Sequence, residues 1–69
     1  MEKNVAETIR QARTQCGLTQ AALGEKLGYE GKIAQITVSG WESGKRPVPL
    51  GKIRPLAAAL GVQIDDLIP

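Results

Sequence analysis

The side chains of this chain that could do chemistry are basic and amide groups gathered between residues 32 and 54. That stretch carries one acidic residue, Glu42, and five basic ones: Lys32, Lys45, Arg46, Lys52 and Arg54. Its net charge is therefore +4, whereas residues 1–31 sum to zero and residues 55–69 carry −2. A local excess of positive charge in a small domain favours an anionic partner, and the alternative is a solvated basic loop.

The rest of the composition excludes most catalytic chemistry. The chain has no histidine and a single cysteine, Cys16, so it lacks a histidine-based catalytic pair, a Cys/His zinc site and an intrachain disulfide. The adjacent carboxylates Asp65 and Asp66 would point roughly 100° apart on a helix, which prevents them from acting as an acid/base pair. We therefore expect no enzyme activity, no metal and no cofactor, and we interpret the two aspartates as helix N-terminal charges.

Length and hydropathy indicate one small folded domain over residues 1–69. A hydrophobic fraction of 42% is ordinary for a globular protein and argues against disorder. No apolar run approaches the roughly 18 residues of a membrane span, and the N-terminal MEKNVAETIR is too polar for a signal peptide. Because Cys16 fits a reducing compartment as a small apolar residue, we expect a cytoplasmic protein.

Apolar residues at helical spacing predict the first two helices. An apolar stripe predicts a helix over residues 3–16, with Asn4 near the start of that helix. The residues of the stripe are Val5, Ile9, Ala12 and Cys16. Thr19 is a favourable N-cap for a short second helix over residues 19–27. Only Gly17 and Leu18 separate the two elements, so they must pack at an angle.

Three further elements are predicted. A third helix runs from residue 32 or 33 to 43, ends at Gly44 and turns inward Ala34, Val38 and Trp41. A fourth helix starts late, near Lys52, so that Pro55 lies in its first turn, and it ends at Gly61. Its apolar stripe consists of Ile53, Leu56, Ala57 and Leu60. A last turn contains Ile64, Leu67 and Ile68. No strand alternation is present, so the prediction is an all-α, compact bundle of five short helices.

The order of helix, tight turn, short helix, loop and helix is that of a helix-turn-helix protein. Three segments within residues 9–68 carry a closer resemblance: IRQARTQCGLTQAALGEKLG, ITVSGWESGKRPVP and LAAALGVQIDDLI. In combination they resemble the phage repressor/Cro-type helix-turn-helix family (XRE-like), which has the lambda repressor-like DNA-binding fold. The resemblance implies a sequence-specific regulator of transcription, expected to be a repressor, that binds double-stranded DNA with its third helix in the major groove.

The resemblance assigns base contacts to the outward face of the third helix: Lys32, Gln35, Ile36, Ser39 and Gly40. The Gln35 amide can bind adenine N6 and N7 together, and Ile36 can contact a thymine methyl group unless it belongs to the core or to a partner surface. Gly40 stands where related proteins usually carry a long polar side chain. Either Gly40 lets the helix backbone lie closer to DNA, or the chain is a weakly specific binder.

Contacts to the DNA phosphates are implied at two places. One is the start of the second helix, at Thr19 and Gln20. The other is the turn after the recognition helix, which offers Ser43, Lys45 and Arg46. Such contacts position the protein and supply much of its affinity. The resemblance also implies a structural ion pair that joins the first helix to the end of the third, formed by Arg13 and Glu42.

The sequence departs from the family pattern at two places. The stretch from Gly28 to Trp41 exceeds the usual turn plus recognition helix by roughly the residues YEGK. Either the loop bulges, or the helix gains a turn at its N-terminus and moves Lys32 toward the groove. At the start of the last turn, Gln63 is a poorer cap than the serine or threonine usual there.

Partners other than DNA follow from the same resemblance. We expect a weak homodimer through the C-terminal helices, which would use Val62, Ile64, Leu67 and Ile68. The alternative function is an antitoxin or adaptor domain whose main partner is another protein, and co-purification of a partner would distinguish the two.

Overall fold

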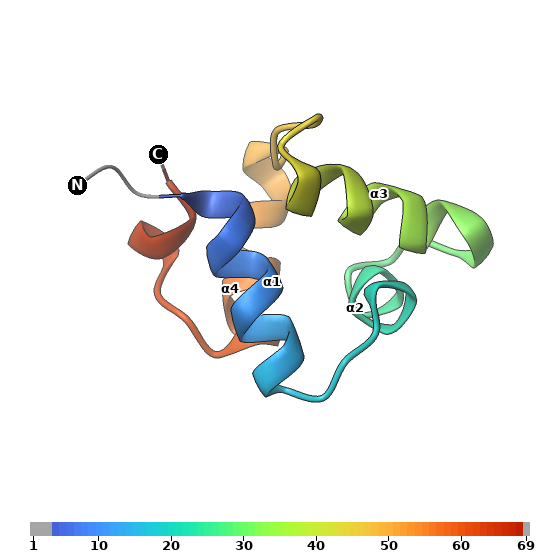
Figure 1. The fold of residues 1–69 in the computed structure, drawn as a ribbon, viewed down its shortest axis with the longest axis horizontal. Coiled ribbons are helices and arrows are strands. Elements are labelled where there is room, and N and C mark those ends of the chain that lie inside the picture. Colours follow the sequence, from blue (N-terminus) through green and yellow to red (C-terminus); the bar gives the residue numbers. More distant parts are fainter. Residues whose placement is uncertain (1–3, 69) are drawn as a thin grey trace.

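The computed structural model describes residues 4–68 and has four α-helices and one 3-10 turn (Figure 1). These are α1 (Val5–Gln15), α2 (Gln20–Lys26), α3 (Gly31–Ser43), α4 (Leu50–Leu60) and η1 (Ile64–Leu67). No strand occurs among residues 4–68. The all-α prediction of five short elements is therefore confirmed, with one of the five a 3-10 turn. Within the same residues, no helix is long and apolar enough to cross a membrane.

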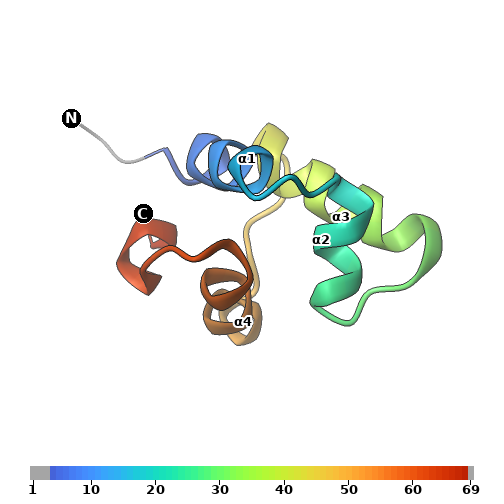
Figure 2. The same ribbon diagram turned by 90° about the horizontal axis from the view of Figure 1, so that it is seen from below.

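The helices form two groups. In Figures 1 and 2, α2 and α3 lie together at one end of the molecule, and α1, α4 and η1 lie at the other. The turn η1 packs against both α1 and α4, close to the first turn of α1. The C-terminal half of α3 reaches α1, so that α3 spans the two groups and presents its remaining face outward.

Local capping determines the ends of α1 and α2. The Asn4 side chain accepts a hydrogen bond from the backbone N–H of Glu7 at 3.1 Å, and Thr19 Oγ1 accepts one from that of Ala22 at 3.0 Å. Both predicted N-terminal caps are thus confirmed; residue 3, the predicted start of the first helix, lies outside the described residues. Cys16 was expected to face the core, but it is exposed because α1 ends at Gln15 and Cys16 is its C-cap.

The helix α3 begins at Gly31, earlier than the predicted residue 32 or 33. Gly31 has a φ of +59°, a left-handed conformation that glycine adopts without strain, and the chain can therefore turn directly into the helix. Of the extra segment YEGK, Tyr29 and Glu30 lie in the loop and the other two residues form the first turn of α3. Two of the four extra residues therefore lengthen the loop and two lengthen the helix at its N-terminus. Lys32 lies in the first turn of the helix and is exposed.

The helix α4 begins at Leu50, so the predicted late start near Lys52 is wrong, and Pro55 lies inside the helix. Pro55 lacks the N–H that would bond to the Gly51 carbonyl, but both residues are exposed, so water can reach that carbonyl. The opposite face of α4 is buried, and this packing stabilises the helix in spite of the lost bond.

The start of the turn η1 is held by one of the two aspartates expected there. The Gln63 backbone N–H donates to Asp66 Oδ2 at 3.1 Å, the bond that the third residue of a helix makes in a capping box. Asp66 therefore stabilises the start of this turn, as expected for a helix N-terminal charge.

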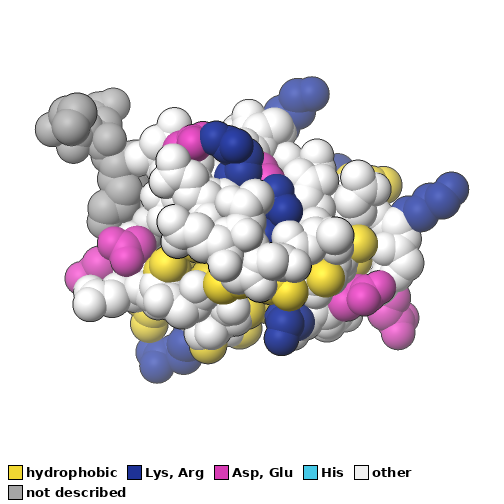
Figure 3. Space-filling model, turned by 60° about the horizontal axis from the view of Figure 1, so that its bottom comes forward, with side chains coloured by type: hydrophobic (Ala, Val, Ile, Leu, Met, Phe, Trp, Pro, Cys, Tyr) yellow, Lys and Arg dark blue, Asp and Glu magenta, His cyan; other side chains and the backbone are white. Residues whose placement is uncertain are grey.

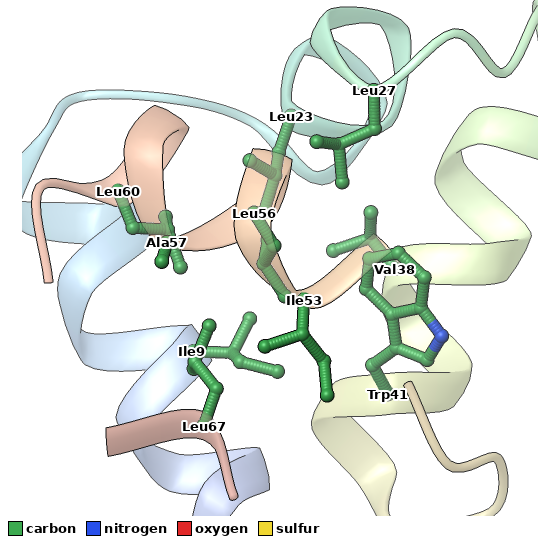
Figure 4. Packing of buried hydrophobic residues seen from close by; sticks show 10 residues of the cluster. All are labelled: Ile9, Leu23, Leu27, Val38, Trp41, Ile53, Leu56, Ala57, Leu60 and Leu67. Carbon is green, nitrogen blue, oxygen red and sulfur yellow. The ribbon is translucent and has the colours of Figure 1, made fainter. Parts of the chain in front are cut away.

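The core lies where α1, α3 and α4 meet. Side chains from all four helices and η1 converge on it (Figure 4); they are Ile9, Leu23, Leu27, Val38, Trp41, Ile53, Leu56, Ala57, Leu60 and Leu67. The Tyr29 ring packs on Trp41 edge to face, with ring centroids 6.0 Å apart. Lys52 lies over the Tyr29 ring and its Nζ donates to the Leu27 carbonyl at 2.8 Å. Lys52 thus joins α4 to the C-terminal end of α2, although the sequence analysis counted it with the basic stretch.

Gly24 allows α2 and α3 to pack in direct contact. A Cβ atom at Gly24 would lie 2.7 Å from Ala34 Cα and equally close to the Ala34 carbonyl carbon, and both of these are backbone atoms that cannot move aside. The spacing of apolar residues carries no sign of a close backbone approach, so this role of Gly24 could not be predicted from the sequence.

We expect Gly24→Ala to lower the free energy of unfolding by about 1–3 kcal/mol, since overpacking outweighs the higher helix propensity of alanine. Gly51→Ala is the matched control, because a Cβ there would contact nothing within 4 Å. The control should be neutral or stabilising. Urea denaturation of both variants measures the difference, and a Gly24→Ala variant as stable as the control would contradict the close packing.

Candidate nucleic-acid interface

The outward face of α3 carries most of the residues expected to contact bases. Lys32, Gln35 and Ile36 are exposed, with Ile36 at 51%, while Ser39 and Gly40 are half-buried. Ile33 also lies on this surface at 62% exposure, and the sequence analysis did not assign it outward. The structure therefore makes this face a mixture of cationic, amide and branched apolar groups. These are the groups that can contact phosphates, base edges and thymine methyls.

A network of polar side chains holds α3 to the two preceding helices. Arg13 Nε donates to Glu42 Oε2 at 2.6 Å, and Arg13 Nη2 donates to Glu42 Oε1 at 3.1 Å. Arg13 Nη1 also donates to the Leu18 carbonyl at 2.8 Å. The side chains of Arg13 and Glu42 are only 13% and 5% exposed. The ion pair implied by the resemblance is thus present, and it is bidentate, which fixes the relative orientation of α1 and α3.

The charge state of Arg13 follows from this contact. The hydrogen bond to Glu42 raises the pKa of the Arg13 guanidinium above its ordinary value, and it outweighs the opposing effect of burial. The guanidinium therefore stays charged throughout the range in which proteins are studied. Its contribution to stability is complete below the ordinary arginine pKa and would be lost only as the pH rose through the raised value.

Gln20 belongs to the same network. Its Nε2 donates to Glu42 Oε1 at 3.2 Å. A glutamine amide has two N–H donors, so one remains for a phosphate oxygen. Thr19 has a similar capacity, because its hydroxyl oxygen accepts the capping bond and its own hydrogen remains available. Both residues expected at phosphates can therefore donate to one without giving up their structural role.

Ser43, the last residue of α3, and the turn that follows it carry the second group of residues expected at phosphates. The Ser43 hydroxyl donates to the Gly40 carbonyl at 3.2 Å, so its one hydrogen is used within the protein. Gly44 has a φ of +78° and reverses the chain there, which confirms it as the cap of α3. Lys45 and Arg46 follow on the exposed surface. The two cations therefore offer exposed donors just beyond the end of α3.

The exposed basic side chains of residues 32–54 lie on α3, in the turn after it and on α4. Figure 3 views the molecule with the underside of Figure 1 brought forward; on this face basic and acidic side chains are interspersed around a band of apolar ones. The Lys52 ammonium group is bound to the Leu27 carbonyl and the Tyr29 ring. The exposed cations of residues 32–54 are therefore Lys32 on α3, Lys45 and Arg46 in the turn, and Arg54 on α4.

The nearest side chain to the Cβ position of Gly40 is that of Arg46. A Cβ atom at Gly40 would lie 2.9 Å from Cδ of Arg46 and 3.1 Å from its Cγ. The Arg46 side chain therefore lies over the position where a side chain of residue 40 would start. Neither of the two explanations given above for Gly40 included this contact.

An apolar groove of about 420 Å³ lies beside the C-terminal end of α3, where Trp41, Gly44 and Arg46 belong to its lining. Its lining includes Leu50, which is 88% exposed, and Ile68, which is 44% exposed. The surface expected to form a dimer is corrected accordingly. Leu67 is 1% exposed and belongs to the core, and Val62 and Ile64 are half-buried against it. Among those four residues only Ile68 is exposed, because η1 and the loop before it turn the other three inward.

Comparison with known proteins agrees with this architecture. The chain belongs to the helix-turn-helix family HTH_3, which it matches over residues 9–67, and this is a family of DNA-binding regulators of transcription rather than of enzymes. None of the curated proteins matches the chain. Among solved structures it is similar to one titled "Crystal Structure of Apo-HppE", with a TM-score of 0.77 and 31% identity. The similarity covers 97% of this chain and 35% of that one, so the chain spans about a third of that protein.

Proposed function

We propose that this chain is a cytoplasmic transcriptional repressor that reads double-stranded DNA by placing α3 in the major groove. The observation that carries the proposal is the ion-pair network of Arg13, Gln20 and Glu42, which holds α3 so that its outer face is free of other helices. A recognition helix must be held rigidly, because base contacts require donors and acceptors at set positions.

The proposed DNA contacts fall into two groups, those to base edges and those to phosphates. On α3, the Gln35 amide has the donor and acceptor needed for adenine, and Ile36 offers methyl groups for thymine. Lys32 and Ser39 lie on the same helix as further polar groups for base edges. Around this face, Thr19, Gln20 and Lys45 supply donors for phosphates, which set affinity and register.

We further propose that two copies bind together, as helix-turn-helix proteins do on half-sites roughly 34 Å apart. The groove lined by Leu50 and Ile68 is the exposed apolar surface best suited to this contact. It borders only the C-terminal end of α3, at Trp41 and Gly44, so a dimer formed there would leave Gln35 and Ile36 uncovered. The small size of the surface favours a weak dimer that DNA strengthens.

A second candidate function is an adaptor or antitoxin domain that binds a protein. The exposed Ile33 and Ile36 favour it, because neighbouring branched apolar groups on one helix face also suit a protein groove. The similar solved structure matches this chain over about a third of its own length, so a similar fold also occurs within a longer chain.

Selection of bound oligonucleotides from a random DNA pool at near-physiological salt tests the proposal. We expect a consensus with two inverted half-sites. Binding without a consensus, or no binding, would contradict sequence reading and favour the adaptor.

On the selected site, we expect Gln35→Ala to weaken discrimination at one base pair of each half-site by about 1–3 kcal/mol, the value of a bidentate base contact. Lys45→Ala is the comparison variant. It should weaken binding to all sequences alike and lower the slope of log K against log salt by about one contact. Competition titrations with single-base variants of the site measure both effects. An unchanged preference in Gln35→Ala would remove that residue from base reading.

A further inference from the structure

The unexplained feature of the recognition helix is Gly40. A glycine inside a helix costs about 1 kcal/mol relative to alanine. Gly40 is half-buried and its φ is not positive, so the backbone there does not require glycine. The reason must lie in what occupies the space of the missing side chain.

That space is taken by Arg46. The atoms of its stem approach the ideal Cβ position of residue 40 in order, with Cβ at 3.4 Å, Cγ at 3.1 Å and Cδ at 2.9 Å. The stem therefore runs toward position 40, and the guanidinium begins next to it. An alanine at this position would push the stem aside.

The backbone holds the same arrangement. The Arg46 N–H donates to the Gly40 carbonyl at 3.1 Å, so the turn folds back beside the end of α3 (Figure 1). Ser43 donates to the same carbonyl. These two bonds hold the backbone of the turn, and with it the Cβ atom of Arg46, against the helix. Arg46 as a whole residue stays exposed.

Position 40 lies one helical turn after Ile36, on the same side of α3. We propose that Arg46 is a specificity-determining residue that Gly40 positions: its guanidinium takes the place of the absent side chain and binds the O6 and N7 atoms of a guanine. Arginine at guanine is the commonest specific contact in the major groove. This inference rests on the proposed DNA-binding function, and it gives Arg46 a different role from the phosphate contact implied by the resemblance.

The test uses four variants on the selected DNA site: Arg46→Ala, Gly40→Ala, the double variant, and Lys45→Ala as a neighbouring cation. Gly40→Ala is a clean perturbation, because it removes no polar group, favours the helix and displaces only a flexible side chain. Thermal melting should show that it unfolds no lower than the wild-type protein.

We expect Arg46→Ala and Gly40→Ala each to lose discrimination at the same G·C pair by roughly 5- to 150-fold, the range for one bidentate contact. The double variant should lose no more than Arg46→Ala alone, since both changes remove one interaction. Lys45→Ala should lower binding to all sequences by the same factor.

Two results would overturn the inference and leave the proposed function intact. Arg46→Ala could behave like Lys45→Ala, with a uniform loss and a lower salt slope, which would make it a phosphate contact. Alternatively, Gly40→Ala could keep the wild-type preference, which would show that Gly40 does not position Arg46. If the wild-type protein selects no DNA sequence, the proposed function fails and the inference fails with it.

Discussion

Replacing Glu42 with alanine will lower the free energy of unfolding by about 3 kcal/mol, the lower end of the range for breaking a buried ion pair. The variant leaves the Arg13 guanidinium, only 13% exposed, without its carboxylate, and it removes the acceptor of Gln20. We place the value low because Arg13 keeps its bond to the Leu18 carbonyl and some access to water. Urea denaturation followed by circular dichroism measures the loss.

Two further variants show whether the loss comes from the pair. Glu25→Ala removes an exposed carboxylate from α2 and should change stability by less than about 0.5 kcal/mol. The double variant Arg13→Met, Glu42→Leu should recover much of the stability, since it leaves no buried charge unpaired. A Glu42→Ala loss below about 1 kcal/mol would mean that this pair behaves as a surface ion pair and does not hold α3 in place.

Replacing Trp41 with alanine is expected to cost about 3–5 kcal/mol, since the indole is 3% exposed and its loss leaves a cavity between α3 and Tyr29. A chain of this length has a total stability of about 3–10 kcal/mol, so the variant loses about a third of its stability or more. Denaturation in the presence of a stabilising osmolyte brings the transition into a measurable range.

Trp41→Phe is the control, because it keeps an aromatic ring against Tyr29. It should lose clearly less than Trp41→Ala. A Trp41→Ala variant that melts within a few degrees of the wild-type protein would show that Trp41 does not anchor the recognition helix in the core.

Much of the fold could be predicted from local sequence signals. Asn4 and Thr19 have short polar side chains that cap helices, Gly44 and Gly61 end them, and the stripes on α3 and α4 were assigned to the correct faces. These features depend on neighbours within one or two turns, which is why spacing alone reveals them. Cys16 was misplaced because the stripe was extended one residue past the end of its helix.

Features that depend on contacts between distant segments could not be predicted in this way. Gly24 faces the backbone of Ala34, and Lys52 reaches the end of α2 from α4. Pro55 is tolerated inside α4 because the tertiary packing of its buried face outweighs one lost bond. The approach of Arg46 to Gly40 likewise appears only when the turn after α3 is built.

Amide chemical-shift mapping on the isotope-labelled protein, titrated with its selected duplex, tests most directly whether α3 reads the DNA. The account predicts the largest changes on the outer face of α3, around Gln35 and Ser39, with smaller ones at Thr19, Gln20 and the turn at Lys45. An unrelated duplex should leave the α3 changes weaker while affecting the same phosphate-contacting residues. Changes centred on the groove of Leu50 and Ile68, with α3 unaffected, would contradict it.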